Sequence, residues 1–260
     1  MRNFGKTIWL VLLASAGCAG ETIAPQTRHR LDAARQAYQK GENRQVVQYT
    51  EEILRDEAHG EGAMQAHYLR GMAMYRLKEY DPAREDLRFV YDRTRNIDLR
   101  IKATDTLGEL AYLRGSLDEA DQLFGEVLDQ TRDGERPADH ARFRRGCIRQ
   151  RRGQWSQADV ELEKVTYHFP NTSVAEKARR CVRGRSWTIQ VGSYDRKNNA
   201  AAAATRFQQA GMKTYIEPVL RDGKMVFLLQ VGRWGQYKTA ESHLPSVRTL
   251  KNDAFLHVAR

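Results

Sequence analysis

Alternating apolar and polar residues mark two short stretches near the end of the chain. In Trp187–Tyr194, WTIQVGSY, and in Phe227–Trp234, FLLQVGRW, the alternation runs to a glycine, and an aromatic residue follows two positions later. A period of two is typical of a strand with one buried face, and the glycine is typical of a tight turn at its end. Trp187, Ile189 and Val191 are therefore expected to point into a core.

The polar positions of both stretches are expected on the opposite, outer face, where Gln190 and Gln230 each stand two residues before their glycine. The other expected elements are a helix at Asn198–Gln209 with asparagine caps, a strand at Lys213–Val219, a hairpin turn at Arg221–Lys224, a helix at Tyr237–Leu250 and a strand at Ala254–Val258. This βαββαβ order predicts a small α+β domain in which two helices cover one face of a four-stranded antiparallel sheet.

The two stretches resemble a known family. IQVGSY at 189–194 and FLLQVGRW at 227–234 are similar to the first and third strands of the SPOR domain (sporulation-related repeat), and the resemblance covers residues 185–260. It implies non-catalytic binding to peptidoglycan, to glycan strands that lack stem peptides, and enrichment at the division septum. Leu228 stands where the family often has Arg, and Arg233 where it usually has Pro, which predicts a difference on the third-strand side.

Five residues are the candidates for glycan contact. The resemblance implies this role for Gln190, Ser193 and Tyr194, whereas Gln230 and Trp234 follow from the strand register. Amide and hydroxyl groups are suited to hydrogen bonds with sugars, and aromatic rings offer flat apolar faces to them.

Before this domain, from residue 28 to 184, the chain has helical periodicity and a repeat. Small residues recur at Gly71, Gly108 and Gly146, with alanines twelve residues later at Ala83, Ala120 and Ala158 and large apolar residues four further on at Leu87, Phe124 and Leu162. The pattern resembles the tetratricopeptide repeat (TPR). The small residues are expected where paired helices approach closely and the large ones in the seam between them.

A weaker copy of the repeat at 31–53 and a last helix at 173–184 complete the helical part. Gly184 follows Gly146 by 38 residues, which predicts a half-repeat that covers the open end of the stack. We therefore expect four repeats and a capping helix, an all-α TPR-like solenoid that binds an unidentified protein partner.

The first 17 residues have the layout of a secretory signal peptide. Arg2 and Lys6 precede the apolar run Ile8–Ala14, which is too short to span a membrane. Ser15-Ala16-Gly17-Cys18 resembles a bacterial lipobox, which implies lipid attachment at Cys18, a tether at 18–27 and, with Ala19 next, the periplasmic face of the outer membrane. An ordinary cleaved signal is the alternative. The lipid is the only membrane attachment expected.

Charge is concentrated in the last domain. Residues 184–260 hold 12 Lys or Arg against 5 Asp or Glu, while residues 21–183 hold 29 against 28. A basic βαββαβ sheet also describes an RNA-binding module, which needs exposed aromatic residues on its strands. Gln190, Thr188, Leu228 and Gln230 occupy those positions instead. This and the export signal argue against nucleic acid and favour an anionic envelope polymer or an acidic protein.

The arginines and the cysteines within the repeats each have two alternative interpretations. The run Arg142–Arg152 is either a solvated helix face or a docking face for an acidic partner. Cys147 and Cys181 fall in first helices of successive units, either as a disulfide or as two buried thiols.

Catalytic and metal-binding patterns are missing from the sequence. The seven histidines are scattered, Gly192-Ser193 lacks the Gly-x-Ser-x-Gly elbow, and no cysteine pair has zinc spacing. We therefore expect no enzyme, cofactor or metal site.

These observations predict an envelope lipoprotein that binds peptidoglycan and, through its repeats, a protein of cell division or wall remodelling. The alternative is a TPR adaptor for outer-membrane or envelope assembly with the last domain as a passive cell-wall anchor. The stretch His168–Ala178, which resembles repeat joints of periplasmic assembly lipoproteins, supports that alternative.

Overall fold

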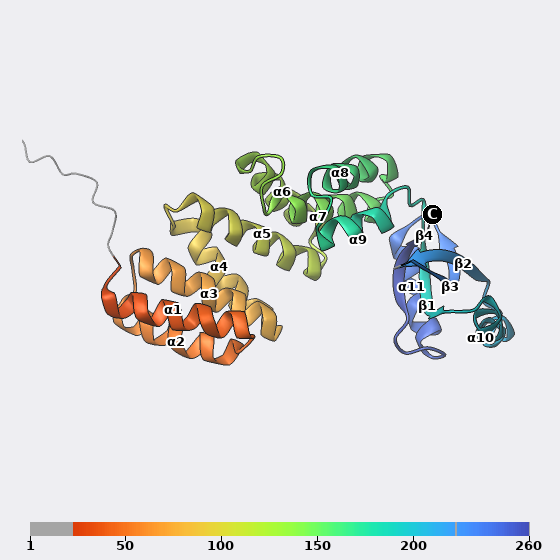
Figure 1. Cartoon of the computed structure of the whole chain (residues 1–260), viewed down its shortest axis with the longest axis horizontal. Helices are drawn as coiled ribbons and strands as arrows, with labels where there is room; N and C mark the ends of the chain where they lie inside the picture. The colour runs from red at the N-terminus through yellow and green to blue at the C-terminus, as the bar shows by residue number, and fades with distance from the viewer. Residues whose placement is uncertain (1–22, 222, 260) are drawn as a thin grey trace, which may run out of the picture. The chain divides into compact units, whose positions relative to one another are not determined.

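A computed structural model describes residues 23–221 and 223–259 (Figure 1). The predicted signal peptide, the predicted lipid attachment site Cys18 and the first half of the predicted tether lie outside the described residues. Within the described ranges, no helix has the length and apolar character needed to cross a membrane. The chain folds into two compact units, one that ends at Arg95 and one that begins at Asn96.

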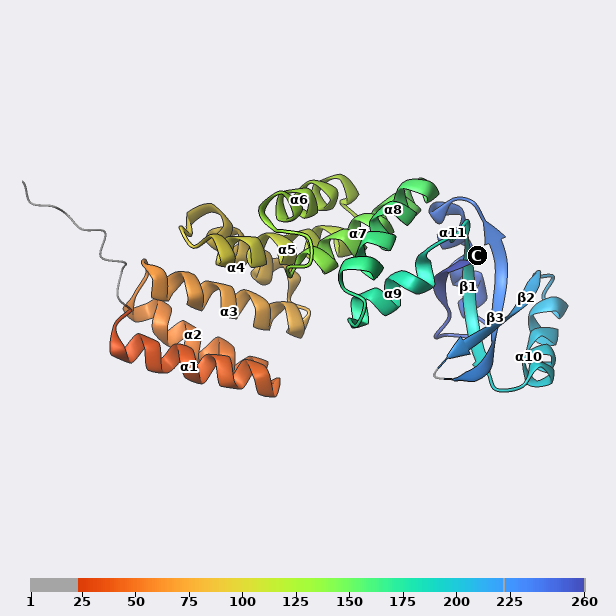
Figure 2. The ribbon, with the colours of Figure 1, turned by 45° about the horizontal axis from the view of Figure 1, so that its top comes forward.

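Helices fill the first unit and the first part of the second. Their bounds are α1 Pro25–Lys40, α2 Asn43–Asp56, α3 Glu61–Leu77, α4 Tyr80–Arg93, α5 Ile97–Arg114, α6 Leu117–Gln130, α7 Ala138–Arg151, α8 Trp155–His168 and α9 Ser173–Cys181 (Figure 2). Consecutive helices pair as α1 with α2, α3 with α4, α5 with α6 and α7 with α8. The described chain therefore contains the four predicted helix pairs and one further helix.

Close approach within each pair explains the recurring glycines. A Cβ added to Gly108 would stand 2.8 Å from the Phe124 ring, and one added to Gly146 would stand 2.8 Å from the Leu162 side chain. Gly71 meets Leu87 in the same way at 2.9 Å. Ordinary contacts of a Cβ begin near 3.4 Å, so each first helix needs a residue without a side chain here. The predicted partnership of small and large positions is confirmed.

The capping helix α9 is confirmed, but the predicted register of Gly184 is wrong. Ala175 and Ala178 of α9 are buried in a cluster with Phe143, Leu162 and Val165 of the last repeat. Helix α9 ends at Cys181, so Gly184 lies beyond it. A Cβ on Gly184 would come within 2.1 Å of Val258 Cγ1. The glycine therefore allows the segment after α9 to pack closely against β4, the last strand.

Five of the six arginines at 142–152 form ion pairs within the described chain, so neither prediction for Arg142–Arg152 describes them; the sixth, Arg151, lies over two tyrosine rings. The partners of the five come from α5, α6, α8 and the loop before α7; the pairs include Arg142 with Asp133, Arg144 with Glu109, Arg145 with Asp121 and Glu161, Arg149 with Asp121, and Arg152 with Asp118 and Asp121. The arginine side chains are 14–25% exposed. Their charge is therefore compensated inside the repeat stack and does not form a docking face.

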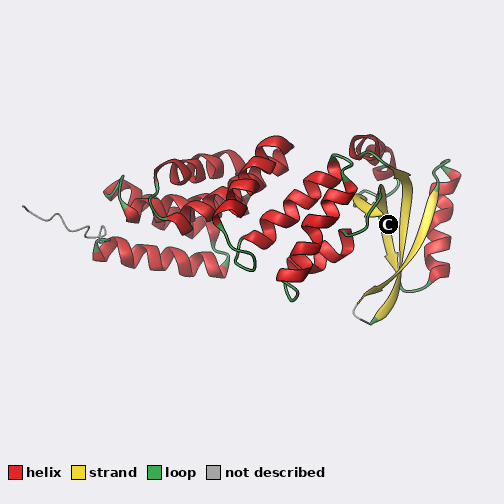
Figure 3. Cartoon of the chain, turned by 90° about the horizontal axis from the view of Figure 1, so that it is seen from above, coloured by secondary structure: helices red, strands yellow, loops and turns green. Residues whose placement is uncertain are grey.

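The last domain has the predicted βαββαβ order (Figure 3). Its elements are β1 Ser186–Tyr194, α10 Lys197–Gln209, β2 Thr214–Arg221, β3 Lys224–Trp234, α11 Tyr237–Arg248 and β4 Phe255–Ala259. The strands form one antiparallel sheet in the order β2-β3-β1-β4. The asparagine cap expected for α10 is absent from this described segment, because Arg196 occupies the N-cap and its side chain makes no capping bond.

One core joins the sheet to both of its helices. Ile189 and Val191 of β1 and Leu229 of β3 pack against Phe207 of α10 and Val247 of α11. The opposite face of the sheet, which we call the outer face, has no helix of this domain on it; strand alternation and register assign to it Thr188, Gln190, Tyr215, Glu217, Leu228, Gln230, Phe255 and His257. The predicted division of β1 into core and outer positions is confirmed as far as Gln190.

Direct contacts connect this domain to the last repeat. The Trp187 indole Nε1 donates to the Gln150 carbonyl at 3.4 Å, and the Gln150 amide donates to the Cys181 carbonyl at 2.9 Å. The guanidinium of Arg151 lies 4.3 Å from the ring centroid of Tyr112 in α5 and 4.5 Å from that of Tyr237 in α11. Trp187 is buried as predicted, but its surroundings include the repeats as well as its own domain.

The two cysteines of the described chain are thiols that pack on one cluster beneath α9. Burial, with a further contribution from the neighbouring Cys181, raises the pKa of the Cys147 thiol to about 12. A thiol in this environment is protonated at neutral pH and has little nucleophilic character. Of the two predictions for this pair, the structure agrees with two free thiols, which are partly rather than fully buried.

Candidate functional site

A pocket of about 390 Å³ opens where β1 ends. We call it the strand-end pocket; it is lined by Gln190, Val191, Gly192, Ser193, Tyr194, Lys251, Asp253 and Phe255. Its residues come from β1, from the start of β4 and from the loop that joins α11 to β4. Three of the five candidates for glycan contact, Gln190, Ser193 and Tyr194, therefore lie together.

Gln190 carries an amide at the edge of this pocket that no other described residue uses. It stands between Gln230 of β3 and Phe255 of β4 in the sheet register, and its side chain makes no hydrogen bond within the described chain. The residue is 7% exposed. An amide with two donors and an acceptor in such a position has its bonding capacity available to a ligand.

Gln230 is different, and the prediction that it lies open on the outer face is wrong. It is on that face but is 0% exposed, because Tyr215 is directly opposite on β2 and Glu217 is beside it. Its amide nitrogen donates to Glu217 Oε2 at 2.8 Å, and its oxygen Oε1 is buried without a partner in the described chain. Gln230 thus fixes Glu217 and is not accessible to a sugar.

Both aromatic candidates lie on the core side of the sheet rather than on the outer face. Strict alternation places Tyr194 and Trp234 beside the glutamines, but the β1–β3 register shifts once in each stretch, as it does at a β-bulge. After the shift, Tyr194 and Trp234 pack against the core below α10 and α11. The prediction that they share a surface with Gln190 and Gln230 is therefore wrong, for a reason that lies in the backbone.

Each aromatic ring folds back over the glycine two residues before it. A Cβ on Gly192 would stand 2.6 Å from the Tyr194 ring, and one on Gly232 would stand 2.0 Å from the Trp234 ring. The Thr188 hydroxyl also donates to the Gly232 carbonyl at 2.7 Å and so holds the second bulge. The Gly-x-aromatic pattern is therefore explained by packing of each aromatic ring on the glycine two residues before it.

Trp234 lies apart from the strand-end pocket. It lines a second hollow of about 420 Å³ together with Met212, Tyr215 and Arg233. Its ring centroid is 4.8 Å from that of His243 in α11, while the Arg233 guanidinium lies 4.7 Å from the Tyr215 ring centroid. The five candidates therefore occupy three places: one pocket, one buried position and one separate hollow.

Phe255 is a further candidate for ligand contact that the sequence did not single out. It is 48% exposed beside Gln190 and lines the strand-end pocket. The signal was present, because alternation in AFLHV directs Ala254, Leu256 and Val258 inward and leaves Phe255 on the other side. The outer face therefore lacks exposed aromatic residues on the described central strands β1 and β3, but it has one on β4, at Phe255.

Two charged residues complete the rim of this pocket. Lys251 Nζ and Asp253 Oδ1 form an ion pair of 2.7 Å, and the hydrogen bond from Lys251 holds the pKa of the exposed Asp253 carboxyl below its usual range. The pair lies in solvent and contributes little to stability. It leaves the rim electrically neutral, so the pocket is suited to a ligand with hydroxyl and amide groups.

The buried histidine His140 belongs to an ion-pair cluster in the repeats. Burial lowers its pKa, but hydrogen bonds and charge attraction from Asp105 and Glu109 outweigh burial and raise the pKa to about 9. Its Nδ1 lies 2.9 Å from Asp105 Oδ1. The imidazolium is therefore charged at neutral pH and links α5 to α7. Among the described residues, no group of three or more His, Cys, Asp or Glu could hold a metal ion.

Comparison with known proteins identifies the two parts. Residues 184–256 match the family model of the SPOR domain, and residues 140–172, which contain most of α7 and all of α8, match that of the tetratricopeptide repeat. Residues 184–256 are a SPOR domain. The SPOR family indicates peptidoglycan binding and the TPR family indicates a protein partner, and both are families of non-catalytic binding modules.

Solved structures similar to the chain are TPR proteins. A tetratricopeptide repeat protein from Parabacteroides merdae is 12% identical, with 72% of this chain and 66% of that chain covered and a TM-score of 0.51. The TPR-like repeats of a putative kinesin light chain of Podosopora anserina are 17% identical, with coverages of 73% and 92% and a TM-score of 0.49. The first likeness supports the helical-repeat fold. No curated protein sequence matches the chain.

Proposed function

We propose that this protein binds peptidoglycan glycan strands that lack stem peptides, and that its strand-end pocket is where the SPOR domain contacts the sugars. The observation that carries the proposal is the unused amide of Gln190 next to the exposed ring of Phe255. Sugar rings bind where a flat apolar side chain lies beside hydrogen-bonding groups. Ser193 is exposed on the same rim.

The roles of the candidates follow from their positions. Gln190 and Ser193 hydrogen-bond hydroxyl or acetamido groups of the glycan, and Phe255 offers the ring face that the sequence assigned to Tyr194 and Trp234. Gln230 has a structural role in this surface, because its amide donates a hydrogen bond to Glu217. Tyr194 shapes the pocket wall by covering Gly192.

The proposed setting is the periplasmic face of the outer membrane, with a lipid on Cys18 and enrichment at the septum. The signal-like first 17 residues and the Ala-Gly-Cys sequence support it. The repeats bind a protein of cell division or wall remodelling. Labelled palmitate that enters the protein but not its Cys18→Ser variant would support the anchor. A reporter fusion distributed evenly round the cell would contradict septal enrichment.

The binding proposal is tested with protein that starts at residue 23 and isolated sacculi. We expect more protein to sediment with sacculi after amidase treatment than before it, and the gain to be lost in Gln190→Ala. Thr205→Ala, which changes an exposed residue of α10, is the matched control and should bind as the wild type does. No sedimentation with either preparation contradicts the proposal and also the passive cell-wall anchor of the alternative, and it directs the search to protein partners of the repeats.

A further inference from the structure

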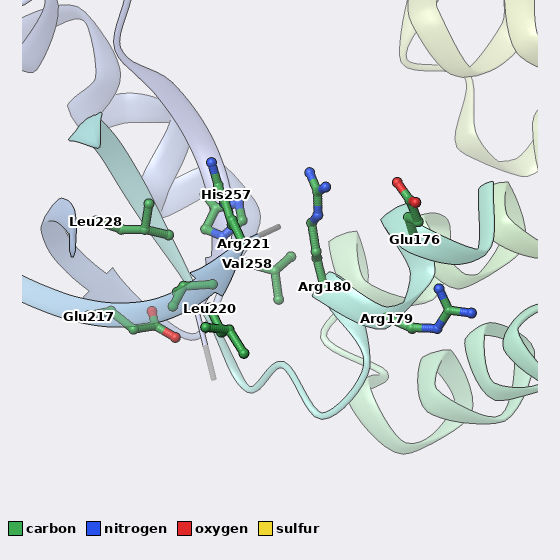
Figure 4. A pocket seen from close by; sticks show the side chains of 10 residues that line it. Glu176, Arg179, Arg180, Glu217, Leu220, Arg221, Leu228, His257 and Val258 are labelled. Atoms are coloured by element: carbon green, nitrogen blue, oxygen red, sulfur yellow. The ribbon is translucent and has the colours of Figure 1, made fainter. Parts of the chain in front are cut away.

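A third pocket of the C-terminal unit lies between α9 and the outer face of the sheet. It has a volume of about 290 Å³. Three arginines and two glutamates line it, with Leu228, His257 and other residues of β2, β3 and β4 (Figure 4). We call it the α9 groove. Because α9 is the capping helix of the repeats, this groove combines residues of both parts of the chain.

Two of the arginines, Arg180 and Arg221, have no compensating charge. Neither forms an ion pair or a side-chain hydrogen bond within the described chain, and the Nε of Arg221 is buried without a partner there. The third, Arg179, donates to the Pro170 carbonyl instead. A buried donor of a charged group that lacks a partner is costly, and an anionic ligand would satisfy it.

The groove continues the surface already described. Leu228 pairs with Ser193 in the sheet, and His257 pairs with Thr188, which stands two residues before Gln190. Figure 4 shows Arg180 extending from α9 beside His257 and Arg221 on the sheet side. A linear polymer that lies along the outer face from the strand-end pocket therefore reaches these arginines.

Neither glutamate of the groove forms an ion pair with Arg180 or Arg221 in the described chain. Glu217 is held by the Gln230 amide at 2.8 Å. Glu176 is exposed in the first turn of α9 and forms no ion pair with Arg180 in the described chain. The groove is thus suited to a small anionic group between Arg180 and Arg221.

The chemistry of the glycan supplies such a group. A stem peptide is joined by an amide bond to the lactyl ether of muramic acid, so hydrolysis of that bond leaves a carboxylate on the sugar. Resting on the proposed function, we infer that the α9 groove binds this free carboxylate through Arg180 and Arg221. Arginine forms charge-assisted hydrogen bonds to carboxylates. A strand that still carries its peptide has a neutral amide at this position, and the groove therefore distinguishes the two.

The test compares two forms of one ligand. Glycan strands released by amidase are immobilised either untreated or after carbodiimide and ammonia have converted their carboxylates to neutral amides. For protein that starts at residue 23, we expect the untreated strands to bind about tenfold more tightly. Arg180→Gln should weaken binding to untreated strands about fivefold and leave binding to amidated strands unchanged. Arg221→Gln should act in the same way.

Lys177→Gln is the matched control, because Lys177 is an exposed cation of the same helix outside the groove. It should bind both forms as the wild type does, and circular dichroism checks that each variant is folded. Equal binding of both forms by the wild type overturns the inference while leaving the proposed function intact. An equal loss in Lys177→Gln, or displacement by polyglutamate as effective as by free glycan, also overturns it. Binding to neither form overturns the proposed function as well.

Discussion

The two strand-end stretches of the SPOR domain share Gln-Val-Gly and a following aromatic residue but have different surroundings. In β1 the stretch ends at a pocket, where the Gln190 amide is unused and Phe255 is exposed beside it. In β3 the corresponding amide, that of Gln230, is buried and bound to Glu217. The neighbouring strands cause the difference. Beside Gln230, β2 supplies a carboxylate acceptor, whereas beside Gln190, β4 supplies an apolar ring that takes no hydrogen bond. Equivalent sequence positions thus line a candidate binding pocket in one strand and form a buried structural hydrogen bond in the other.

The largest expected effect distinguishes the two glycines. Gly232 has a φ of +67°, and its added Cβ would lie 2.0 Å from the Trp234 ring, whereas Gly192 has only the overlap with Tyr194. Gly232→Ala should lower the free energy of unfolding by about 3 kcal/mol and Gly192→Ala by about 1–2 kcal/mol. Urea unfolding followed by tryptophan fluorescence measures both, since Trp155, Trp187 and Trp234 all lie in the C-terminal unit.

Gly235→Ala is the control for that pair, because nothing lies within 4 Å of a Cβ there. Its stability should stay within about 0.5 kcal/mol of the wild type. Equal losses at Gly192 and Gly232 would show that the left-handed backbone at Gly232 has no energetic role.

The next effect separates the two glutamines. Gln230→Ala leaves the Glu217 carboxylate without its amide donor and should lower the free energy of unfolding by about 1–2 kcal/mol. Gln190→Ala removes no internal hydrogen bond, so it should lower the free energy of unfolding by less than Gln230→Ala does, by about 0.5 kcal/mol through lost side-chain packing. Its affinity for denuded glycan should nevertheless fall about fivefold. The comparison between the two strands fails if Gln190→Ala destabilises the domain as much as Gln230→Ala does.

The smallest effect concerns the aromatic residues. Phe255→Ala should weaken glycan binding about threefold to fivefold through loss of its exposed ring, and Phe255→Tyr should restore it. Trp234→Phe keeps a ring over Gly232 and should bind glycan as the wild type does, because Trp234 lies outside the strand-end pocket. Titration with soluble glycan fragments measures the dissociation constants. A loss confined to Trp234→Phe would place the sugars at the second hollow instead.

Local patterns predicted the order of the elements and most of the core. Period-two alternation located β1 and β3, and the glycine recurrence located the seams at Leu87, Phe124 and Leu162. The same alternation failed at Tyr194 and Trp234, because each bulge adds a residue to one strand and reverses the faces that follow. The glycine before each aromatic residue was a sign of this packing.

Contacts between distant residues were not accessible to local patterns. The arginines of α7 find acids on other helices, up to 35 residues away, so no spacing within α7 revealed that their charge is compensated. The α9 groove likewise depends on the docking of a repeat helix near a sheet that begins after it in the chain. The domain boundary drawn from the sequence separates these parts, whereas the α9 groove and the contacts of Trp187 and Arg151 cross it.

The Arg151 side chain, between the rings of Tyr112 and Tyr237, has a mechanical consequence. Helix α9 ends at Cys181 and β1 begins at Ser186, so the connection between them is too short to be a flexible linker. Under the proposed function, a pull on a glycan bound by the sheet would act on α7 and its neighbour α5 through this short connection and the two Arg151 contacts.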